Sequence, residues 1–533
     1  MSAITRRNFV EVASLAGAGL AAMPAASALA SEGLEETTDV WAIEDLPEPS
    51  EVIDADVCVL GAGGTGLAAA IQASQLGLKV VLLEKNAMTG GSFIGSEGLF
   101  ALGSHWQEEA GVDATVSDVI KSVMDFHHWH PHYDLYKAFF DITGDTIQWL
   151  EDLGVEFDHV RSLGTSVVCW HVYKGSSTPG VEFMASMTAA LEKTDVDLEL
   201  ETSGKKLIME DGKVAGCLAL RKDGSALQVN APVVIVGTGG YANNPDVLGE
   251  LSGIDPELTT PSGAAGRDAD GIKMMHEVGA DWADYPGTVM FYGPIPKGSL
   301  WGNLVVGLSL NPILWVNQDA QRFINEDMYL DNFAYVGIAT KNQDQVFTIF
   351  NQKELDHFET VAPLSEIGVW FLPDQPVVGL TDAVNEFMEE FPENGFKADT
   401  VEELAEQCGL DPEALAVTIE RYNGFCETGV DEDFGKVAAD LFPLDEGPYY
   451  AFRAVDAFFC TVGGVRVNPK TEVIGTDGEV ISGLYAGGCD AGGLYGDTYD
   501  VGRCAGSQAS WAINSGRLAA KNAARYLGVE VDE

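Results

Sequence analysis

The sequence predicts an α/β fold that begins with a Rossmann-like nucleotide-binding unit. Residues 56–60 form a short apolar run, as expected of a parallel strand buried on both faces. A glycine-rich turn at 61–66 follows directly, and residues 67–73 have the composition of a helix. A second apolar run at 79–83 ends at Glu84. This order of strand, turn, helix and strand is what a dinucleotide-binding domain requires.

The turn has the GxGxxG spacing, in which each glycine has a physical role. Gly61 permits the tight turn, Gly63 lets the backbone approach a pyrophosphate, and Gly66 lets the helix pack closely on the strand. Gly64 and Thr65 complete the loop at the start of the helix, where free N–H groups and the helix dipole favour phosphate. The turn therefore predicts a site for dinucleotide phosphates.

Two features just beyond the turn extend this site. Glu84 follows the second strand, at a position where an acid binds ribose hydroxyls. A second glycine-rich stretch contains Gly90, Gly91 and Ser92. Two neighbouring glycine-rich loops suit a long cofactor that passes through the domain.

Later segments complete the predicted domain. Residues 206–218 read as a hairpin around an Asp-Gly turn, and 233–236 read as a buried strand that ends in glycines. Near the C-terminus a strand ends at 483–488, and 507–526 has a helical pattern.

Composition excludes several classes of protein. The 533 residues are 46% hydrophobic and 21% charged, which is typical of a folded globular protein. The formal net charge of −52 opposes binding to nucleic acid and leaves open a basic protein partner. The eight cysteines show neither CxxC nor CxxCH spacing, so no zinc ribbon, iron–sulfur motif or c-type haem is predicted.

The N-terminus predicts export. Arg6 and Arg7 precede a weakly apolar stretch rich in Ala and Gly, which ends in an A-x-A cleavage pattern before Ser31. We assign residues 1–30 to a twin-arginine signal peptide and 31–50 to an acidic linker. The expected location is the periplasm or the cell surface.

Two further segments have weaker signals. Residues 127–132 contain four histidines, but Pro131 and the absence of an i, i+4 pair favour an active-site wall or a surface over a metal site. Residues 169–171 (Cys-Trp-His) read as a loop that is a candidate for the active site.

The chain resembles a known family through motifs that occur in a characteristic order. They are GAGGTG at 61–66, Glu84, GGS at 90–92, GTGG at 237–240, DGIKM at 270–274, RFINE at 322–326, TVGGV at 461–465 and GLYAG at 483–487. They resemble FAD-dependent flavoproteins of the fumarate reductase/succinate dehydrogenase type, in the branch with soluble fumarate reductase, urocanate reductase and 3-ketosteroid dehydrogenases. The resemblance covers roughly residues 51–526.

The resemblance implies a domain organisation and a cofactor. A Rossmann-like FAD-binding domain is expected in two parts, 51–287 and 447–533, with an inserted α+β capping domain at 288–446. The residues expected at the FAD are Gly61, Gly63, Gly64, Thr65, Gly66, Glu84, Lys85, Gly90, Gly91, Ser92, Gly239, Asp270, Asp490 and Ser507. No metal is expected.

Departures from the family pattern bear on the substrate. Where fumarate reductases have the proton-delivering arginine after the RFxNE motif, this chain has Leu330. Where they have the histidine that helps to hold a carboxylate, it has Cys460. Fumarate and succinate are therefore not expected as substrates.

The catalytic candidates are Tyr329, Tyr495, Tyr499 and Arg503. Adding a hydride to a C=C bond conjugated to a carbonyl places negative charge on the oxygen, where a fixed donor is most useful. A general acid must then protonate the α-carbon. A tyrosine hydroxyl can do either, and an arginine can hold an acidic substrate. The alternative is that these tyrosines are packing residues with satisfied hydroxyls.

The predicted function is that of an exported FAD-dependent oxidoreductase that reduces an activated C=C bond (an enone or unsaturated acid) in a ring-bearing substrate, with a tyrosine as proton donor. Two alternatives are a 3-ketosteroid-type dehydrogenase that runs the reverse reaction and a flavin electron-transfer subunit. Because only one complete dinucleotide fingerprint is present, electrons are expected from a separate donor, such as a membrane cytochrome or quinol system.

Overall fold

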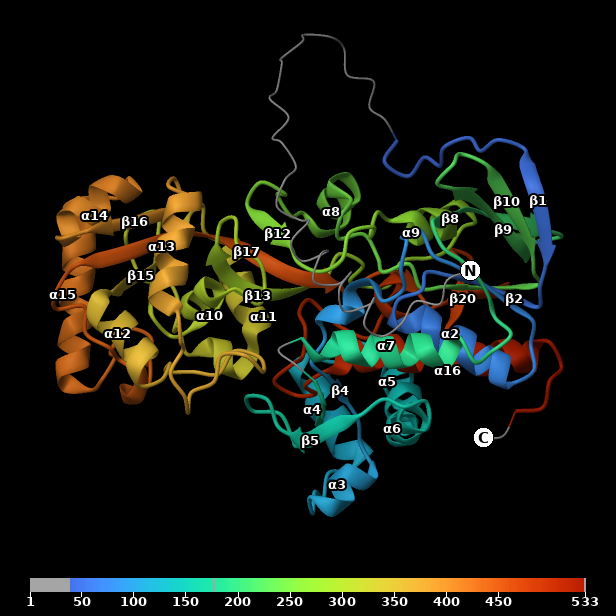
Figure 1. Cartoon of the computed structure of the whole chain (residues 1–533), viewed down its shortest axis with the longest axis horizontal. Coiled ribbons are helices and arrows are strands. Elements are labelled where there is room, and N and C mark those ends of the chain that lie inside the picture. The colour runs from blue at the N-terminus through green and yellow to red at the C-terminus, as the bar shows by residue number, and fades with distance from the viewer. Residues whose placement is uncertain (1–38, 176–177, 532–533) are drawn as a thin grey trace, which may run out of the picture.

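The computed structural model describes residues 39–175 and 178–531, which form two lobes (Figure 1). The predicted signal peptide and residues 31–38 of the predicted linker lie outside the described residues. Residues 39–48 lie on the larger lobe, where the Trp41 ring is 4.7 Å from His276 and 5.2 Å from Trp282.

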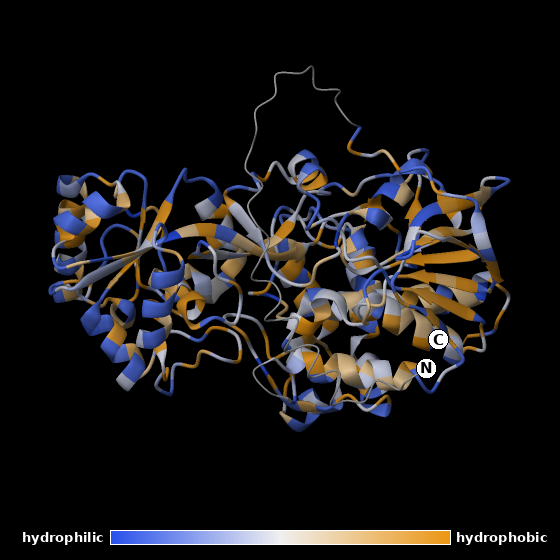
Figure 2. Ribbon diagram, turned by 45° about the horizontal axis from the view of Figure 1, so that its top comes forward, coloured by the Kyte–Doolittle hydropathy of each residue, from blue (hydrophilic) through white to orange (hydrophobic). Residues whose placement is uncertain are grey.

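A six-stranded sheet forms the centre of the larger lobe, in the order β19-β20-β11-β2-β3-β7. All neighbours are parallel except β19 and β20. The strands are β2 (Val57–Leu60), β3 (Val80–Leu83), β7 (Asp197–Glu199), β11 (Val233–Val236), β19 (Glu472–Ile474) and β20 (Val480–Ala486). Their apolar runs are buried between helices on one face and an antiparallel layer of strands on the other, and Figure 2 shows hydrophobic strands here. The predicted α/β fold is confirmed.

Two long helices lie together on this sheet. They are α2 (Gly64–Gln75) and α16 (Ser507–Tyr526), and the observed α16 has the predicted bounds. A Cβ on Gly516 would lie 2.2 Å from the Thr65 carbonyl oxygen, so only glycine permits this approach. The contact places the middle of α16 beside the start of α2, at the glycine-rich turn.

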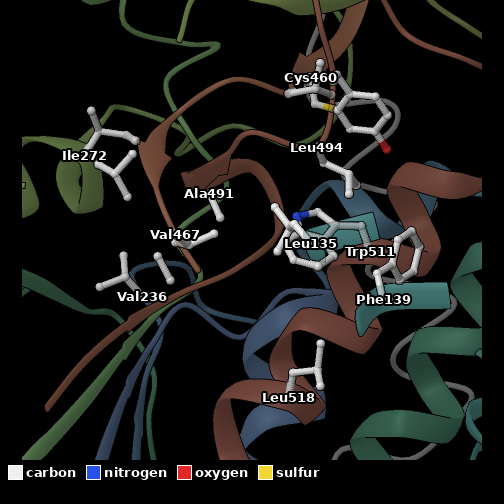
Figure 3. Packing of buried hydrophobic residues seen from close by; sticks show 14 of the residues in the cluster. Leu135, Phe139, Val236, Ile272, Cys460, Val467, Ala491, Leu494, Trp511 and Leu518 are labelled. Atoms are coloured by element: carbon white, nitrogen blue, oxygen red, sulfur yellow. The ribbon is translucent and has the colours of Figure 1, made fainter. Parts of the chain in front are cut away.

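The remaining elements of the larger lobe flank this core. An antiparallel layer contains the predicted hairpin, with strands β1 (Pro49–Asp54), β8 (Thr202–Glu210), β9 (Lys213–Arg221) and β10 (Ala226–Asn230). A second group has strands β4 (Gly98–Phe100), β5 (Phe157–Arg161) and β6 (Trp170–Tyr173) and helices α3 (His105–Glu109), α4 (Val116–Phe126), α5 (Tyr133–Asp141), α6 (Thr143–Asp152) and α7 (Pro179–Leu191). Figure 3 shows Trp511 of α16 packed beside Leu135 and Phe139 of α5.

The smaller lobe is built on a sheet around β17 (Tyr449–Thr461), which runs from this lobe back into the larger one (Figure 1). Its other strands are β12 (Thr259–Pro261), β13 (Val289–Pro296), β14 (Leu314–Asn317), β15 (Val346–Asn351) and β16 (Gly395–Ala398). Its helices are α10 (Leu304–Leu310), α11 (Met328–Lys341), α12 (Gln352–Thr360), α13 (Leu380–Glu390), α14 (Val401–Cys408) and α15 (Pro412–Thr428). We call this lobe the cap.

Further short elements are α8 (Pro245–Ser252), α9 (Asp270–Glu277), β18 (Val465–Arg466) and β21 (Ala491–Gly492). Across the two ranges that the structure describes, every helix is too short or too polar to span a bilayer. An ion pair between Arg161 of the larger lobe and Glu366 of the cap, 2.7 Å apart, joins the lobes on one side.

Candidate active site

The glycine-rich turn between β2 and α2 has a backbone that only glycine allows at two positions. Gly61 has a φ of +92°, and a Cβ there would lie 2.4 Å from the carbonyl oxygen of Gly237. A Cβ on Gly66 would lie 1.6 Å from the Gly61 carbonyl oxygen. These contacts fix the turn against the neighbouring strand and helix.

Gly63 differs, because the space beside it is open. A Cβ there would meet only the Gly90 carbonyl oxygen, at 3.9 Å. Gly63 is also the N-cap of α2, and no side chain caps this helix end. The first N–H groups of α2 therefore remain available to an anion. The Gly90 N–H donates to the Ala62 carbonyl at 2.9 Å and joins the two loops. We call residues 61–66 and 90–91 the glycine cradle.

Glu84 lies at the carboxyl end of β3, against the glycine cradle. Its Oε2 accepts the Ala62 N–H at 2.7 Å, and its Oε1 accepts the Asn86 N–H at 2.8 Å. The carboxylate is thus held rigidly at the edge of the cradle, as an acid that binds a ribose would need to be.

Asp270 begins α9 and lies between two lysines. Its Oδ2 is 2.6 Å from the Lys85 ammonium, and its Oδ1 is 2.7 Å from that of Lys205. Burial alone would raise the pKa of Asp270, but the two ammonium groups lower it. Lys85 also donates to the Gly266 carbonyl at 3.0 Å. Lys85 and Asp270, the two residues here that were expected at the FAD, therefore belong to one charged group. This group joins the side of the lobe that carries the glycine cradle to the loop at 263–270.

Ser92 lies beside a residue that the sequence analysis missed, Arg267. The Ser92 Oγ accepts the Ala264 N–H at 3.3 Å, and a Cβ on Gly263 would touch both Ser92 and Arg267. The Arg267 guanidinium donates to the Asn243 side chain at 2.9 Å and to the Phe459 carbonyl at 2.6 Å. Its Nη2 is buried and has no partner, so a donor remains for a ligand.

Gln508 of α16 is a second missed residue. Its Nε2 donates to the Cys489 sulfur at 3.4 Å, while its Oε1 is buried without a partner. Cys460, at the end of β17, lies next to Cys489 and is labelled in Figure 3. Arg267 approaches the same two cysteines. An unpartnered donor and an unpartnered acceptor thus face one region, which suits the polar edge of a flavin ring.

Asp490 shapes the turn that ends β11. Its fully buried carboxylate accepts the Thr238 hydroxyl and the Gly239 N–H, each at 2.9 Å, and the Gly240 N–H at 3.3 Å. Burial raises its pKa to about 6, although these hydrogen bonds oppose the shift. A direct contact between Asp490 and the cofactor stays a prediction.

The structure brings all three candidate tyrosines into one row of rings. The ring centroids of Tyr329 and Phe333 on α11 are 5.9 Å apart, those of Phe333 and Tyr499 are 6.0 Å apart, and those of Tyr499 and Tyr495 are 5.4 Å apart. The helix is kinked at Asn332, whose side chain donates to the Tyr499 carbonyl at 2.9 Å. We call these four rings the tyrosine row.

An aromatic wall adjoins the row. It consists of Tyr292, Trp301, Trp370 and Phe459, with centroid distances between 4.2 and 5.6 Å along the group. Phe459 also lies 6.2 Å from Phe333 of the row. The Nε1 of Trp370 is buried without a partner. Burial raises the pKa of the neighbouring Glu97 to about 7, while a hydrogen bond from Trp301 opposes the shift.

The remaining candidates lie in different surroundings. The Arg503 guanidinium lies over the Phe126 ring, 5.5 Å from its centroid, and is partly exposed. The Ser507 hydroxyl donates to Asp500 at 2.8 Å, so its predicted contact with the cofactor stays a prediction. In the histidine run, His127 is buried, whereas His128 and His130 are exposed.

The prediction of a loop at 169–171 is wrong for two of the three residues. Trp170 and His171 belong to strand β6, and the His171 ring contacts the Ser104 hydroxyl at 2.6 Å. Burial lowers the pKa of His171 to about 4. Among the described residues, no group of three or more His, Cys, Asp and Glu side chains is arranged to hold a metal ion.

Gly63→Ala tests the cradle. Because the added Cβ meets no protein atom closer than 3.9 Å, the protein is expected to fold normally. The methyl group occupies the space that a pyrophosphate needs, so FAD affinity should fall by about 10- to 100-fold, in line with steric overpacking. Titration of the apoprotein with FAD measures this loss.

The control for this variant is Gly77→Ala, at a glycine remote from the cradle with open space around it. It is expected to affect stability, because Gly77 has a φ of +81°, but not FAD affinity. Equal FAD affinity in Gly63→Ala and the wild type would contradict the assignment of the cradle.

Comparisons with known proteins extend over the cradle and the tyrosine row. A family model described as an FAD binding domain matches residues 56–503. A vinyl phenol reductase of Lactiplantibacillus plantarum is 32% identical over 88% of this chain and 96% of the relative. A urocanate reductase of Eggerthella lenta is 28% identical, over 88% of this chain and 75% of the relative. The open conformation of a flavocytochrome c3 fumarate reductase has a TM-score of 0.69 and 27% identity, covering 90% of this chain and 79% of that chain.

Proposed function

Because the chain belongs to the FAD binding domain family, we propose that it reduces an activated C=C bond in a ring-bearing small molecule with a tyrosine as proton donor. The family resemblance, the FAD cofactor and the class of FAD-dependent oxidoreductase are confirmed by the comparisons. The observation that carries the finer proposal is the tyrosine row, which leads from the aromatic wall to the start of α16.

The residues divide the work of this reaction. FAD, when bound, supplies the hydride for the β-carbon of the substrate. In this proposal the glycine cradle and Glu84 would hold its phosphates and ribose, and the unpartnered atoms of Arg267 and Gln508 would give the ring a donor and an acceptor. A buried tyrosine hydroxyl then polarises the carbonyl or protonates the α-carbon.

Two features indicate the substrate class. One is the aromatic wall, and the other is Cys460 at the position where fumarate reductases have a histidine that helps to hold a carboxylate. Trp301 and Phe459 are only partly buried and can pack on a planar ring, and the unpartnered Trp370 Nε1 can donate to an oxygen on it. Cys460 is a poor anion ligand beside them, which disfavours a dicarboxylate. A vinyl phenol reductase among the relatives supports a substrate with an aryl ring.

A reoxidation screen tests the proposal. Holoenzyme is reduced without oxygen and mixed with aryl alkenes, enones, steroids and fumarate, while flavin absorbance is followed. Fast reoxidation by an aryl alkene or enone, and slow reoxidation by fumarate, is expected. Reoxidation by none of them would favour an electron-transfer subunit. Reduction of the oxidised holoenzyme by a saturated ketosteroid, without reoxidation of the reduced enzyme by the alkenes, would favour the reverse, dehydrogenase reaction.

Arg503→Ala tests the anion clamp. If Arg503 binds an acidic substrate, KM for a carboxylate-bearing acceptor should rise about tenfold or more, because a charge-assisted hydrogen bond contributes roughly 1.5–3 kcal/mol. KM for a neutral acceptor with the same ring should change little. An equal loss for both acceptors would assign Arg503 to packing on Phe126 alone.

Export and the electron source are further parts of the proposal. Arg6, Arg7 and the A-x-A pattern before Ser31 support a twin-arginine signal, and the charge of −52 suits a basic electron donor such as a membrane cytochrome. Cell fractionation of the wild type and of an Arg6→Lys/Arg7→Lys variant tests export. Fast steady-state oxidation of NADH by the purified holoenzyme would contradict a separate donor.

A further inference from the structure

A buried polar chain lies behind Tyr495. The carboxylate of Asp500, in the loop before α16, is fully buried, and His127 at the end of α4 is 1% exposed. Tyr136 of α5 donates its hydroxyl hydrogen to the Asp500 Oδ2 at 2.7 Å. Ser507, the first residue of α16, donates to the Asp500 Oδ1 at 2.8 Å. Three separate helices thus contribute groups to one internal carboxylate.

The hydrogen bonds of this chain have a defined direction. Ser507 Oγ and the Tyr495 hydroxyl are 3.1 Å apart, and since the single Ser507 proton goes to Asp500, Tyr495 is the donor between them. His127 Nδ1 lies 3.4 Å from the Gly496 N–H and accepts from it. The His127 proton therefore lies on Nε2, which faces the Asp500 Oδ2 at 3.4 Å.

The surroundings of Asp500 keep the nearby phenols protonated. Burial first, and the Asp500 charge second, raise the pKa of Tyr136, Tyr495 and Tyr499 well above the ordinary value. The titratable groups that face Asp500 are His127, Tyr136, Tyr495, Tyr499, Cys169 and Cys504. A Tyr495 phenolate, 3% exposed, would be costly here and would need a proton from within the protein.

We propose that Ser507, Asp500 and His127 form a proton relay that restores the Tyr495 hydroxyl after each turnover. This inference rests on the proposed function and adds to it the source of the proton. His127 is the end of the relay away from Tyr495, and its neighbours His128 and His130 are exposed to solvent. The His130 Cβ would lie 3.7 Å from a Cβ on Gly496, the residue that bonds to His127.

The protons balance over one cycle. With substrate bound, the Tyr495 hydroxyl turns from Ser507 to the substrate and gives its phenolic proton to the α-carbon. The Ser507 hydroxyl turns from Asp500 to the phenolate and gives up its proton. A proton from solvent enters at His127 Nδ1 and forms the imidazolium, which gives its Nε2 proton to Asp500. After exchange between its two oxygens, Asp500 gives a proton to the Ser507 oxygen. His127 is left with its proton on Nδ1 and returns to the Nε2–H tautomer by proton exchange with solvent before the next turnover. The substrate gains one proton, solvent loses one, and no electrons move along the chain.

Ser507→Ala cuts the relay next to Tyr495. Its control is Ser510→Ala, one turn further along α16, where an equally buried hydroxyl donates to the Phe100 carbonyl at 2.7 Å. Both serines lose a buried hydrogen bond of similar length, so their effects on stability should be similar. Ser510 is not part of the relay.

Two rates are compared in holoenzyme: the first reoxidation of reduced flavin by an aryl alkene, and steady-state turnover with the same acceptor. In Ser507→Ala and Asp500→Asn, kcat is expected to fall about 10- to 100-fold, in the range of general acid catalysis, with KM nearly unchanged. The first reoxidation should fall much less, because Tyr495 starts with its own proton. Ser510→Ala should keep both rates.

A second readout does not depend on turnover. In holoenzyme labelled with ¹⁵N-histidine, the His127 signals, identified by their loss in His127→Gln, should show the Nε2–H tautomer and should shift in Asp500→Asn. An Nδ1–H tautomer overturns the relay. Equal losses in the first and later turnovers, or an equal loss in Ser510→Ala, also overturn it. A wild type that reduces no acceptor overturns the proposed function and the relay together, whereas an active wild type with unchanged relay variants overturns the relay alone.

Discussion

Tyr495→Phe is expected to lower kcat by about 10²-fold or more, which is the contribution typical of a general acid. The ring keeps its place, because Tyr495 packs at 5.4 Å from Tyr499 and at 6.2 Å from His127. The substitution removes only the hydroxyl that meets Ser507. FAD content and the flavin spectrum should match those of the wild type, and steady-state assays with the acceptor found in the screen measure the loss.

Two further variants make this result specific. Tyr485→Phe, on β20, removes a hydroxyl from another buried tyrosine outside the site and should leave kcat unchanged. Tyr329→Phe tests the other end of the tyrosine row. If Tyr329→Phe lowered kcat far more than Tyr495→Phe, the acid would be Tyr329, and Tyr495 would serve to polarise the carbonyl.

The cofactor-binding core was predictable because its determinants are local. The turn at 61–66, the strands on both sides of it and the glycines at 237–240 each specify a backbone shape within a few residues. The hairpin around residues 211–212 and the helix at 507–526 were found for the same reason. Parallel strands buried on both faces are continuous apolar runs, which a sequence shows directly.

The groups that complete the site were not predictable from local pattern. Asp490 bonds to a turn about 250 residues earlier in the chain, so its role in shaping Gly239 depends on tertiary contacts. Arg267 and Gln508 are significant because one polar atom of each stays buried without a partner. A glycine-rich segment around Arg267 was the only sequence signal, and nothing local marks Gln508.

The histidine run shows why residue type alone misleads. The sequence of the four histidines within residues 127–132 favoured an active-site wall or a surface over a metal site, and did not separate His127 from the others. The end of α4 instead separates them, so that His127 turns inward to Asp500 while its neighbours stay exposed. Its partner lies 373 residues away, a separation that no periodicity can report.

Arg322→Ala should be the most destabilising single substitution in the cap. The Arg322 side chain, 4% exposed, bonds to Glu326 at 2.7 Å and to Asp431 at 2.9 Å, and both carboxylates are fully buried. Removing the guanidinium leaves two buried anions that only Lys436, 3.7 Å from Glu326, partly balances. Breaking a buried ion pair in this way costs roughly 3–5 kcal/mol in the free energy of unfolding. Denaturant unfolding followed by tryptophan fluorescence measures it.

The pH dependence of stability distinguishes this ion network from packing. Burial would raise the pKa of Asp431, but Arg322 outweighs it and lowers the pKa to about 2. A group with a lowered folded-state pKa stabilises the fold above its ordinary pKa, and this stabilisation is lost as pH falls towards the folded value. The wild type should therefore lose this stabilisation between about pH 4 and pH 2, whereas Arg322→Ala should lack that part of the acid sensitivity.

Arg421→Ala, which breaks an exposed pair with Asp433 in the same lobe, should change stability little. If Arg322→Ala were no worse than Arg421→Ala, the RFINE motif would have no structural role in the cap.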